Sequence, residues 1–198
     1  MNAKSVALAI TFAAVAITLN VVRIPTFYYP GTSYQLVQIP IVVAFLLFGV
    51  RIGVLVGVLS VAGWLILFPL GALGFLVYPM DLVSSLIMFA GLFVANKFMV
   101  RNGSGSVSVW KSSAVGLTAF AVVFRGGIMP IIDYGVVYHV LVPLVLGITV
   151  PEAAIVGLVP SFILYNATVP LFTIPIAYVV AIKVARYLRI EPSLLRLG

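Results

Sequence analysis

The sequence predicts an all-α integral membrane protein, a bundle of six transmembrane helices with both termini in the cytoplasm. Of its 198 residues, 64% are hydrophobic and 8% are charged, which is too few charges to cover a soluble domain of this size. Apolar stretches of about 18 or more residues recur along the chain, and each can cross a bilayer. The basic residues stand at the ends of these stretches. Together these observations indicate one membrane domain over residues 1–198.

Six apolar segments supply the expected helices, which are, in chain order, 5–22, 34–49, 52–68, 81–100, 110–129 and 150–187. The connection "RIPTFYYPGTSYQ" ends the first helix, because its prolines and glycine disfavour helical continuation. The second and third helices meet at Arg51, the only charge between Ile39 and Met80. A cation at mid-bilayer costs about 2.5–3.5 kcal/mol or more. We therefore expect a tight cytoplasmic turn at Arg51, which Gly49 and Gly53 allow.

The second half of the chain is richer in helix breakers. "PLGALGFLVYP" is interpreted as a loop or re-entrant segment, after which Asp81 caps the fourth helix. "NGSGSVS" is a flexible linker before the fifth helix, and prolines and glycines interrupt residues 130–148. Thr149 and Glu152 have the spacing of a capping box for the last helix. That helix is too long for one crossing, and we expect kinks at its prolines, Pro160, Pro170 and Pro175.

The basic residues test this order of crossings. Six crossings place nine of them on one side, namely Lys4, Arg51, Lys97, Arg101, Lys111, Lys183, Arg186, Arg189 and Arg196. Arg23 falls on the other side and Arg125 falls within the fifth helix. Cytoplasmic loops carry an excess of Lys and Arg, so a multi-pass plasma-membrane protein with cytoplasmic termini is predicted. The net charge of +7 therefore reflects topology, and no nucleic-acid partner is expected.

The candidate binding residues are the ionisable groups away from the cytoplasmic side and the external tyrosines. Arg125 is either functional or structurally paired with Asp81 or Asp133. The tyrosines fit an interfacial belt, but the dense segment "TFYYPGTSYQLVQ" also suits stacking on a planar heterocycle. In "YNAT", side chains either satisfy carbonyls freed by kinks or contact the ligand. The candidates are Tyr28, Tyr29, Tyr34, Gln35, Gln38, Asp81, Arg125, Asp133, Tyr134, Tyr138, His139, Tyr165 and Asn166.

Catalytic and metal sites have less support. The chain has no cysteine and one histidine, so no metal site is expected. Asp133, His139 and Ser161 could be combined into a triad, but no nucleophile motif surrounds the serine. The chain also lacks a phosphate-binding loop, so energy for transport would come from a partner. We expect no enzymatic activity; the alternative is a membrane enzyme that uses Asp133, His139 and Arg125 on a lipid-like substrate.

Two long segments carry a resemblance to a known family. They are "YQLVQIPIVVAFLLFGVRIGVLVGVLSVAGWLILFP" and "AAIVGLVPSFILYNATVPLFTIPIAYVVAIKVARYL". The first is similar to the first loop and the second and third helices of the substrate-binding S-components of energy-coupling factor (ECF) vitamin transporters, and the second resembles the sixth helix of the riboflavin-type members. The resemblance covers nearly the whole chain. In the first helix, Ala9 and Ala13 fit the family's small-residue motif for contact with a membrane partner; packing within the bundle is the alternative.

This resemblance implies an outer pocket capped by external loops, a membrane scaffold protein and two cytoplasmic ATPases as partners. It also implies that the ligand is a vitamin or cofactor precursor, with riboflavin as the first expectation and no covalently bound cofactor. The riboflavin-type motif Pro-Phe-Asn-x-x-Lys-Gly is altered, because Phe162 and Tyr165 stand at its asparagine and lysine positions. A thiamine-like cation on the carboxylates and tyrosines stays open, as does a carboxylate such as biotin or pantothenate on Arg125 or Arg23.

Overall fold

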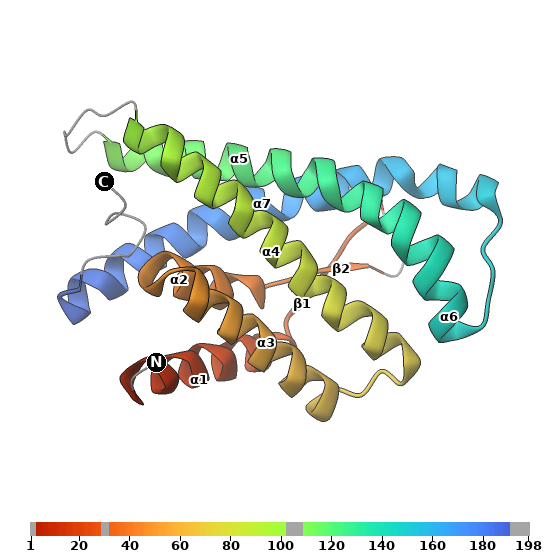
Figure 1. The fold of residues 1–198 in the computed structure, drawn as a ribbon, viewed down its shortest axis with the longest axis horizontal. Coiled ribbons are helices and arrows are strands. Elements are labelled where there is room, and N and C mark those ends of the chain that lie inside the picture. Colours follow the sequence, from red (N-terminus) through yellow and green to blue (C-terminus); the bar gives the residue numbers. More distant parts are fainter. Residues whose placement is uncertain (1–2, 29–31, 102–108, 191–198) are drawn as a thin grey trace.

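The computed structural model describes residues 3–28, 32–101 and 109–190, which form a helical bundle with one small hairpin (Figure 1). The helices are α1 (Ala3–Leu19), α2 (Gln38–Phe48), α3 (Val50–Leu67), α4 (Ala72–Arg101), α5 (Val109–Ile132), α6 (Val142–Leu146) and α7 (Glu152–Leu188). A π-helix, η1 (Asp133–Leu141), joins α5 to α6. Strands β1 (Arg23–Pro25) and β2 (Ser33–Gln35) pair antiparallel. The predicted helical architecture is therefore confirmed.

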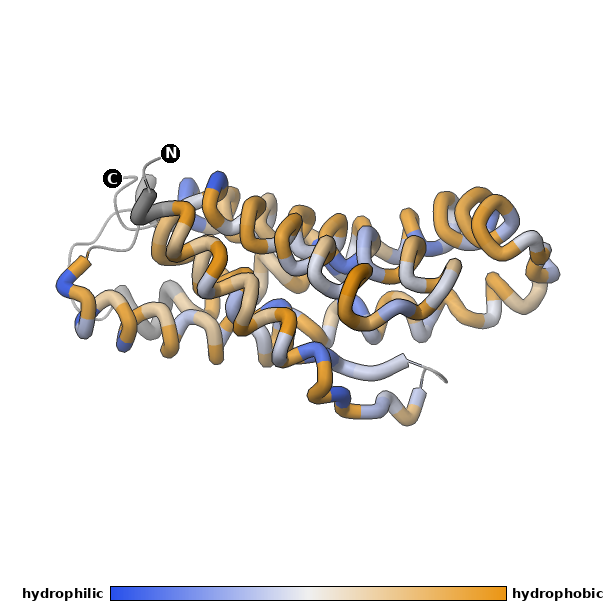
Figure 2. The backbone as a smooth tube through the Cα atoms, turned by 90° about the horizontal axis from the view of Figure 1, so that it is seen from below, coloured by the Kyte–Doolittle hydropathy of each residue, from blue (hydrophilic) through white to orange (hydrophobic). Residues whose placement is uncertain are grey.

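Four described segments are long and apolar enough to cross a membrane: Val50–Leu67, Ala72–Phe98, Ala114–Leu146 and Glu152–Leu188. Figure 2 shows hydrophobic residues along most of the helices, with hydrophilic residues at helix ends and around the hairpin. The apolar helix α2 has 11 residues and rises by about 16 Å, roughly half the thickness of a hydrocarbon core. Length alone therefore does not make α2 a complete crossing.

The helix α2 forms the centre of the bundle. It packs against α1, α3, α4 and α7, and every residue from 40 to 47 is buried. Phe45 stacks on Phe89 of α4 with ring centroids 4.2 Å apart. A helix that is apolar on every side belongs inside a protein or a membrane. Here the other helices provide that surrounding, which explains why this short helix is the most apolar of the chain.

The predicted turn at Arg51 is confirmed. Gly49 lies between α2 and α3 with φ of 88°, a conformation that glycine adopts without the strain of a side chain. A Cβ at Gly53 would lie 2.7 Å from the Cβ of Phe45, so the absence of a side chain there lets the two helices approach. Arg51 itself is exposed in the first turn of α3.

The predicted basic positions share one end of the bundle. Figure 1 shows the start of α1, the α2–α3 turn, the end of α4, the start of α5 and the end of α7 at this end. These elements carry Lys4, Arg51, Lys97, Arg101, Lys111, Lys183, Arg186 and Arg189. Arg196, the linker 102–108 and Tyr29 lie outside the described residues. We call this end the basic end.

Two expectations for α4 are wrong. The helix begins at Ala72, so residues 72–80 form neither a loop nor a re-entrant segment, and Asp81 lies inside the helix without capping it. Pro79 was read as a breaker, but a proline removes one backbone donor, and neighbouring helices can compensate for this in a membrane protein. Tyr78 also secures the start of α4, because its hydroxyl donates to the Phe68 carbonyl at 2.7 Å.

The segment 130–148 is continuous helix up to Leu146, so the expected interruption is wrong at Pro130, Gly135 and Pro143 and is confirmed only at Gly147. Pro130 lies inside α5, and η1 and α6 follow directly. The chain breaks at Gly147, which has φ of 67°. The capping box at Thr149 is wrong as well: Pro151 precedes the first residue of α7 and no side chain caps this end. The Glu152 side chain instead bonds to η1.

The hairpin shortens the predicted second helix. Residues 33–35 pair with residues 23–25, with Ile24 opposite Tyr34, and the helix starts at Gln38 rather than at residue 34. Strands of three residues are too short to leave a clear periodic pattern in a sequence. The expected helix 5–22 likewise ends early, at Leu19, while the expected helix 150–187 agrees closely with α7 and contains all three prolines.

Candidate ligand-binding site

A cavity of about 540 Å³ lies between the hairpin, α4, α5, η1, α6 and α7. It reaches Leu70 in the α3–α4 connection and Ile148 in the α6–α7 connection, so it lies away from the basic end. Its apolar wall includes Leu73, Val77, Met129, Val137 and Leu146. Its polar wall consists of Arg23, Thr32, Ser33, Gln35, Tyr78, Asp81, Ser84, Arg125, Asp133, Tyr138, Tyr165 and Asn166. The volume lies within the range of small-molecule sites, about 300–1,000 Å³.

A chain of hydrogen bonds runs through the bundle beside this cavity. Arg125 Nη1 donates to Gln38 Oε1, and Arg125 Nε donates to Asn166 Oδ1 at 3.3 Å. Asn166 Nδ2 donates to Asp133 Oδ2 at 3.0 Å. Gln38 Nε2 donates to Ser84 Oγ at 3.3 Å. We call these five residues the buried network; it joins α2, α4, α5, η1 and α7.

The charge of Arg125 is unusually placed. The residue is 1% exposed, and its recorded partners are the neutral amides of Gln38 and Asn166. Within the described residues, no carboxylate comes within 4.0 Å of its guanidinium. The sequence offered direct pairing with Asp81 or Asp133 as the structural alternative, but Asn166 mediates the link to Asp133. A buried cation without a contact ion pair is costly, so such a residue points to a functional role.

Asp81 lines the cavity from α4, and its Oδ2 atom is buried without a hydrogen-bond partner. Ser84 and Ser85 both donate to the Asp81 backbone carbonyl at 2.9 Å, so their hydroxyls do not serve the carboxylate. Buried polar atoms are nearly always hydrogen-bonded in native proteins. Among the described residues no donor reaches Asp81 Oδ2, so this oxygen can accept a hydrogen bond from a molecule in the cavity.

The hairpin is fastened to α7 by a group that we call the tyrosine cluster, formed by Tyr28, Tyr34, Tyr165 and Thr168. The Tyr28 and Tyr34 hydroxyls bond to each other, and they contact Thr168 Oγ1 at 3.1 and 2.6 Å respectively. Tyr34 stacks on Tyr165 with centroids 5.5 Å apart. Partial burial raises the pKa of Tyr28, so its hydroxyl stays protonated and can donate. The cluster holds the hairpin over one side of the cavity.

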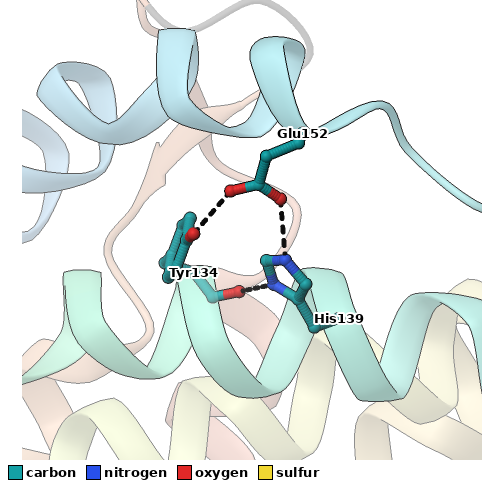
Figure 3. A network of polar contacts seen from close by, with 3 residues as sticks. All are labelled: Tyr134, His139 and Glu152. Atoms are coloured by element: carbon teal, nitrogen blue, oxygen red, sulfur yellow. Dashed lines mark hydrogen bonds and ion pairs between the residues drawn. The ribbon is translucent and has the colours of Figure 1, made fainter.

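A second polar group lies outside the cavity, on the outer surface of η1 (Figure 3). The Tyr134 hydroxyl donates to Glu152 Oε1 at 2.5 Å, and His139 Nε2 lies 2.9 Å from Glu152 Oε2. His139 Nδ1 lies 2.6 Å from the Tyr134 carbonyl. We call these three residues the rim network. It connects η1 to the first residue of α7 across the α6–α7 connection.

The structure brings some of the predicted ligand-binding residues together and separates others. Those that line the cavity are Gln35, Asp81, Arg125, Asp133, Tyr138, Tyr165 and Asn166. Gln38 supports Arg125 from α2, and Tyr28 and Tyr34 belong to the tyrosine cluster. Tyr134 and His139 do not line this cavity and belong to the rim network instead. Ser84 and Met129 line it without having been predicted; Ser84 lies three residues after Asp81, on the same side of α4.

The predicted partner surface on α1 is not available in the folded chain. Ala9 and Ala13 are 0% and 3% exposed, and they belong to the core that α1 forms with α2 and α3. Small residues do permit close helix packing, but here they permit it within the bundle. The opposite side of α1 is exposed and also carries small residues, namely Ala7, Thr11, Ala14 and Thr18.

The residues that a catalytic triad would need are not assembled. Ser161 Oγ donates to the Tyr28 carbonyl at 3.0 Å, His139 bonds to the rim network, and Asp133 bonds to Asn166. Among the described residues, no three His, Asp or Glu side chains are grouped as a metal site would require.

Comparison of the chain with protein-family models and with curated proteins gave no match.

Proposed function

We propose that this chain is the substrate-binding membrane subunit of an ECF-type importer and that it takes up a vitamin or a related cofactor precursor. The observation that supports this most is the cavity of about 540 Å³, whose lining combines a buried cation without a contact ion pair and a carboxylate oxygen without a partner among the described residues with several apolar side chains. Specific small-molecule sites combine an apolar lining with a few convergent polar groups. The sequence resemblance to S-components points to the same function.

The orientation that fits uptake places the basic end in the cytoplasm. Cytoplasmic loops carry the excess of Lys and Arg, and the cavity lies away from the basic end. With α5, η1 and α6 counted as one crossing, and with α1 and α2 counted as one crossing each, the chain crosses the plasma membrane six times. The cavity then faces the exterior, from which a solute is captured.

The cysteine-free chain allows this orientation to be tested directly. Arg51→Cys and Thr149→Cys place single thiols at exposed positions at opposite ends of the bundle. A membrane-impermeant maleimide applied to intact cells should label Thr149→Cys and leave Arg51→Cys unlabelled until the membrane is opened. Labelling of Arg51→Cys in intact cells would reverse the orientation and exclude uptake from the exterior.

Partners are proposed to be a membrane scaffold protein and two ATPases. Because Ala9 and Ala13 are buried, the surface of α1 that a scaffold helix can reach is the exposed side that carries Ala7, Thr11 and Ala14. The Thr11 hydroxyl already bonds to the Ala7 carbonyl at 2.9 Å, so this side leaves no hydroxyl unsatisfied in an apolar contact. Ala14→Trp should prevent co-purification of the scaffold while the chain stays folded, whereas Ala9→Trp should disrupt the fold.

The proposed function is tested by asking what the purified protein holds. Native mass spectrometry of the detergent-solubilised chain should detect a small molecule in the wild type. The amount bound should fall strongly in Arg125→Met, and Glu152→Gln, a change outside the cavity, should retain it. Thermal unfolding of each variant separates loss of binding from loss of fold. A folded wild type that never carries a solute, including after incubation with cell extract, would contradict the proposal.

A further inference from the structure

We infer that the ligand of this cavity is a molecule without net charge that presents a hydrogen-bond donor to Asp81 and an acceptor to Arg125, and carries an apolar body. This inference rests on the proposed function and narrows it to one substrate class. Neutral heterocycles with adjacent N–H and C=O groups, such as cyclic imides and ureides, belong to this class. Permanent cations and simple carboxylates do not.

The donor follows from Asp81. Its Oδ2 atom is buried, has no partner among the described residues and belongs to a residue that lines the cavity. Two other residues of the same helix that line the cavity carry hydroxyls, but Tyr78 donates to the Phe68 carbonyl and Ser84 donates to the Asp81 backbone carbonyl. Leaving a buried acceptor unsatisfied costs free energy, and a ligand N–H at this position would remove that cost. The site therefore favours a ligand that donates here.

The acceptor follows from Arg125. A guanidinium offers N–H groups on Nε and on both Nη atoms, and the recorded bonds of Arg125 use Nε and Nη1. Among the described residues Nη2 has no hydrogen-bond acceptor, although Arg125 lines the same cavity as Asp81. A ligand carbonyl or ring nitrogen can accept from it. Since Gln38 and Asn166 hold the guanidinium from two other helices, its position is fixed before a ligand arrives.

The absence of a net charge on the ligand follows from the charges of the residues that line the cavity. The ionisable Arg, Lys, Asp and Glu residues that line the cavity are Arg23, Arg125, Asp81 and Asp133. Their formal charges cancel. A cation would satisfy Asp81 but would approach Arg125, and a carboxylate would accept from Arg125 but would leave Asp81 without a donor and approach Asp133. A neutral donor–acceptor pair serves both groups without adding an unbalanced charge to a buried site.

The apolar body follows from the rest of the cavity lining. Leu73 and Val77 line the cavity on the helix that carries Asp81, and Met129 lines it on the helix that carries Arg125. Val137 and Leu146 line it as well. A ligand ring system placed against these side chains would remove apolar surface from water, at about 25 cal/mol per Å² buried. Because the cavity is lined by both polar and apolar side chains, it requires an amphipathic ligand. A fused-ring heterocycle is consistent with this requirement.

Matched probes and variants test this inference. The probes are lumichrome (a neutral fused-ring imide with N–H groups at N1 and N3), its 1,3-dimethyl derivative, which lacks both N–H groups, thiamine as a cation and pantothenate as a carboxylate. Titration calorimetry on ligand-free protein should show lumichrome binding at least about tenfold more tightly than the other three. Tightest binding of thiamine or pantothenate would overturn the inference. Equal binding of lumichrome and the 1,3-dimethyl derivative would show that no ligand N–H is needed, and this would overturn the inference.

Substitutions at Asp81 separate hydrogen bonding from charge. Asp81→Asn keeps an oxygen acceptor, so lumichrome affinity should fall about threefold or less, while Asp81→Leu should lower it about tenfold or more. Equal losses in both variants would mean that charge is what matters, and this would overturn the neutral class. Glu152→Gln should bind as the wild type does and serves as the control for folding.

The composition of a co-purified molecule decides the case in which no probe binds. A neutral compound with N–H groups supports the inference, and a cation or a carboxylate overturns it while leaving the proposed function intact. Absence of any co-purified solute, together with failure of all probes, overturns the proposed function and the ligand class together.

Discussion

The buried network and the rim network are built from similar groups and both include residues of η1, yet their surroundings differ. Arg125 and Asn166 are 1% and 3% exposed, whereas the side chains of His139 and Glu152 are 40% and 57% exposed. A hydrogen bond lost in a water-free site leaves its partner unsatisfied, while water replaces a bond lost at the surface. Hydrogen-bond geometry alone therefore does not tell which of the two networks contributes more to the free energy of unfolding. Similar substitutions should have very unequal effects.

The largest effect is expected from Asn166→Leu. Asn166 accepts from Arg125 and donates to Asp133, so leucine would leave Asp133 without its hydrogen bond among the described residues and Arg125 with Gln38 alone. Hydrogen bonds to charged groups contribute about 1.5–3 kcal/mol each, so we expect a loss of about 3 kcal/mol or more in unfolding free energy. The thermal midpoint in a fixed detergent measures this, with Ile163→Leu on the exposed side of α7 as control. Unchanged stability would show that water reaches the network.

A smaller loss is expected from Gln38→Leu. This change removes one acceptor of Arg125 and one contact to Ser84, while the bond from Arg125 to Asn166 remains. We expect about 1–3 kcal/mol. In the double variant with Asn166→Leu the two losses should not add, because both residues share Arg125 as a partner. Additive losses in a double-mutant cycle would show that the two amides act independently, and the term network would then be unjustified.

The difference between the two networks also shows which site residues could be predicted from the sequence and which could not. It predicted Arg125, Asp133 and Asn166 as candidates, because polar groups inside apolar helices are expected to be functional. The sequence could not show that Asp133 and Tyr138 line the cavity while their neighbours Tyr134 and His139 do not. The π-helix decides this: residues five apart share one side of such a helix, although they diverge on an α-helix. The local sequence contains no signal that predicts this change from an α-helix to a π-helix.

The helices themselves were more predictable than their ends. Apolar length located every main segment, and Gly49 located the α2–α3 turn. Proline was misleading at Pro79 and Pro130, which lie inside helices because tertiary neighbours can compensate for a missing backbone donor. For Ala9 and Ala13 the sequence left two alternatives, because a small-residue stripe packs equally well within a bundle and against a partner, and the structure shows the packing within the bundle.

An intermediate case lies between the two networks. Thr168→Val removes the part-buried hydroxyl that contacts Tyr28 and Tyr34 and so loosens the hairpin from α7. We expect about 1 kcal/mol, since these are neutral hydrogen bonds. The loss should be local, so hydrogen exchange of residues 23–35 should increase more than exchange in α2 or α5. Uniformly faster exchange along the chain would mean that the hairpin and the bundle open as one unit.

The smallest effects are expected in the rim network, and they test the comparison most sharply. Glu152→Gln keeps an acceptor for the Tyr134 hydroxyl and removes the charge beside His139. His139→Gln keeps a polar group at the same position. Since water can solvate both sites, neither change should shift the thermal midpoint measurably, and neither should alter ligand binding. Ionic strength should also have little effect on the thermal midpoint, because the opposite charges of His139 and Glu152 contribute little to stability at this exposed site.

A fall in the midpoint as large as that of Asn166→Leu would have a definite meaning. It would show that the rim network is removed from water in the assembled protein, by lipid or by another chain, although the isolated chain exposes it. The charge on Glu152 would then be as costly to leave unpaired as the charge on Arg125. Repeating the measurement in detergent and in lipid nanodiscs distinguishes the two coverings, because only lipid makes the effect depend on the medium.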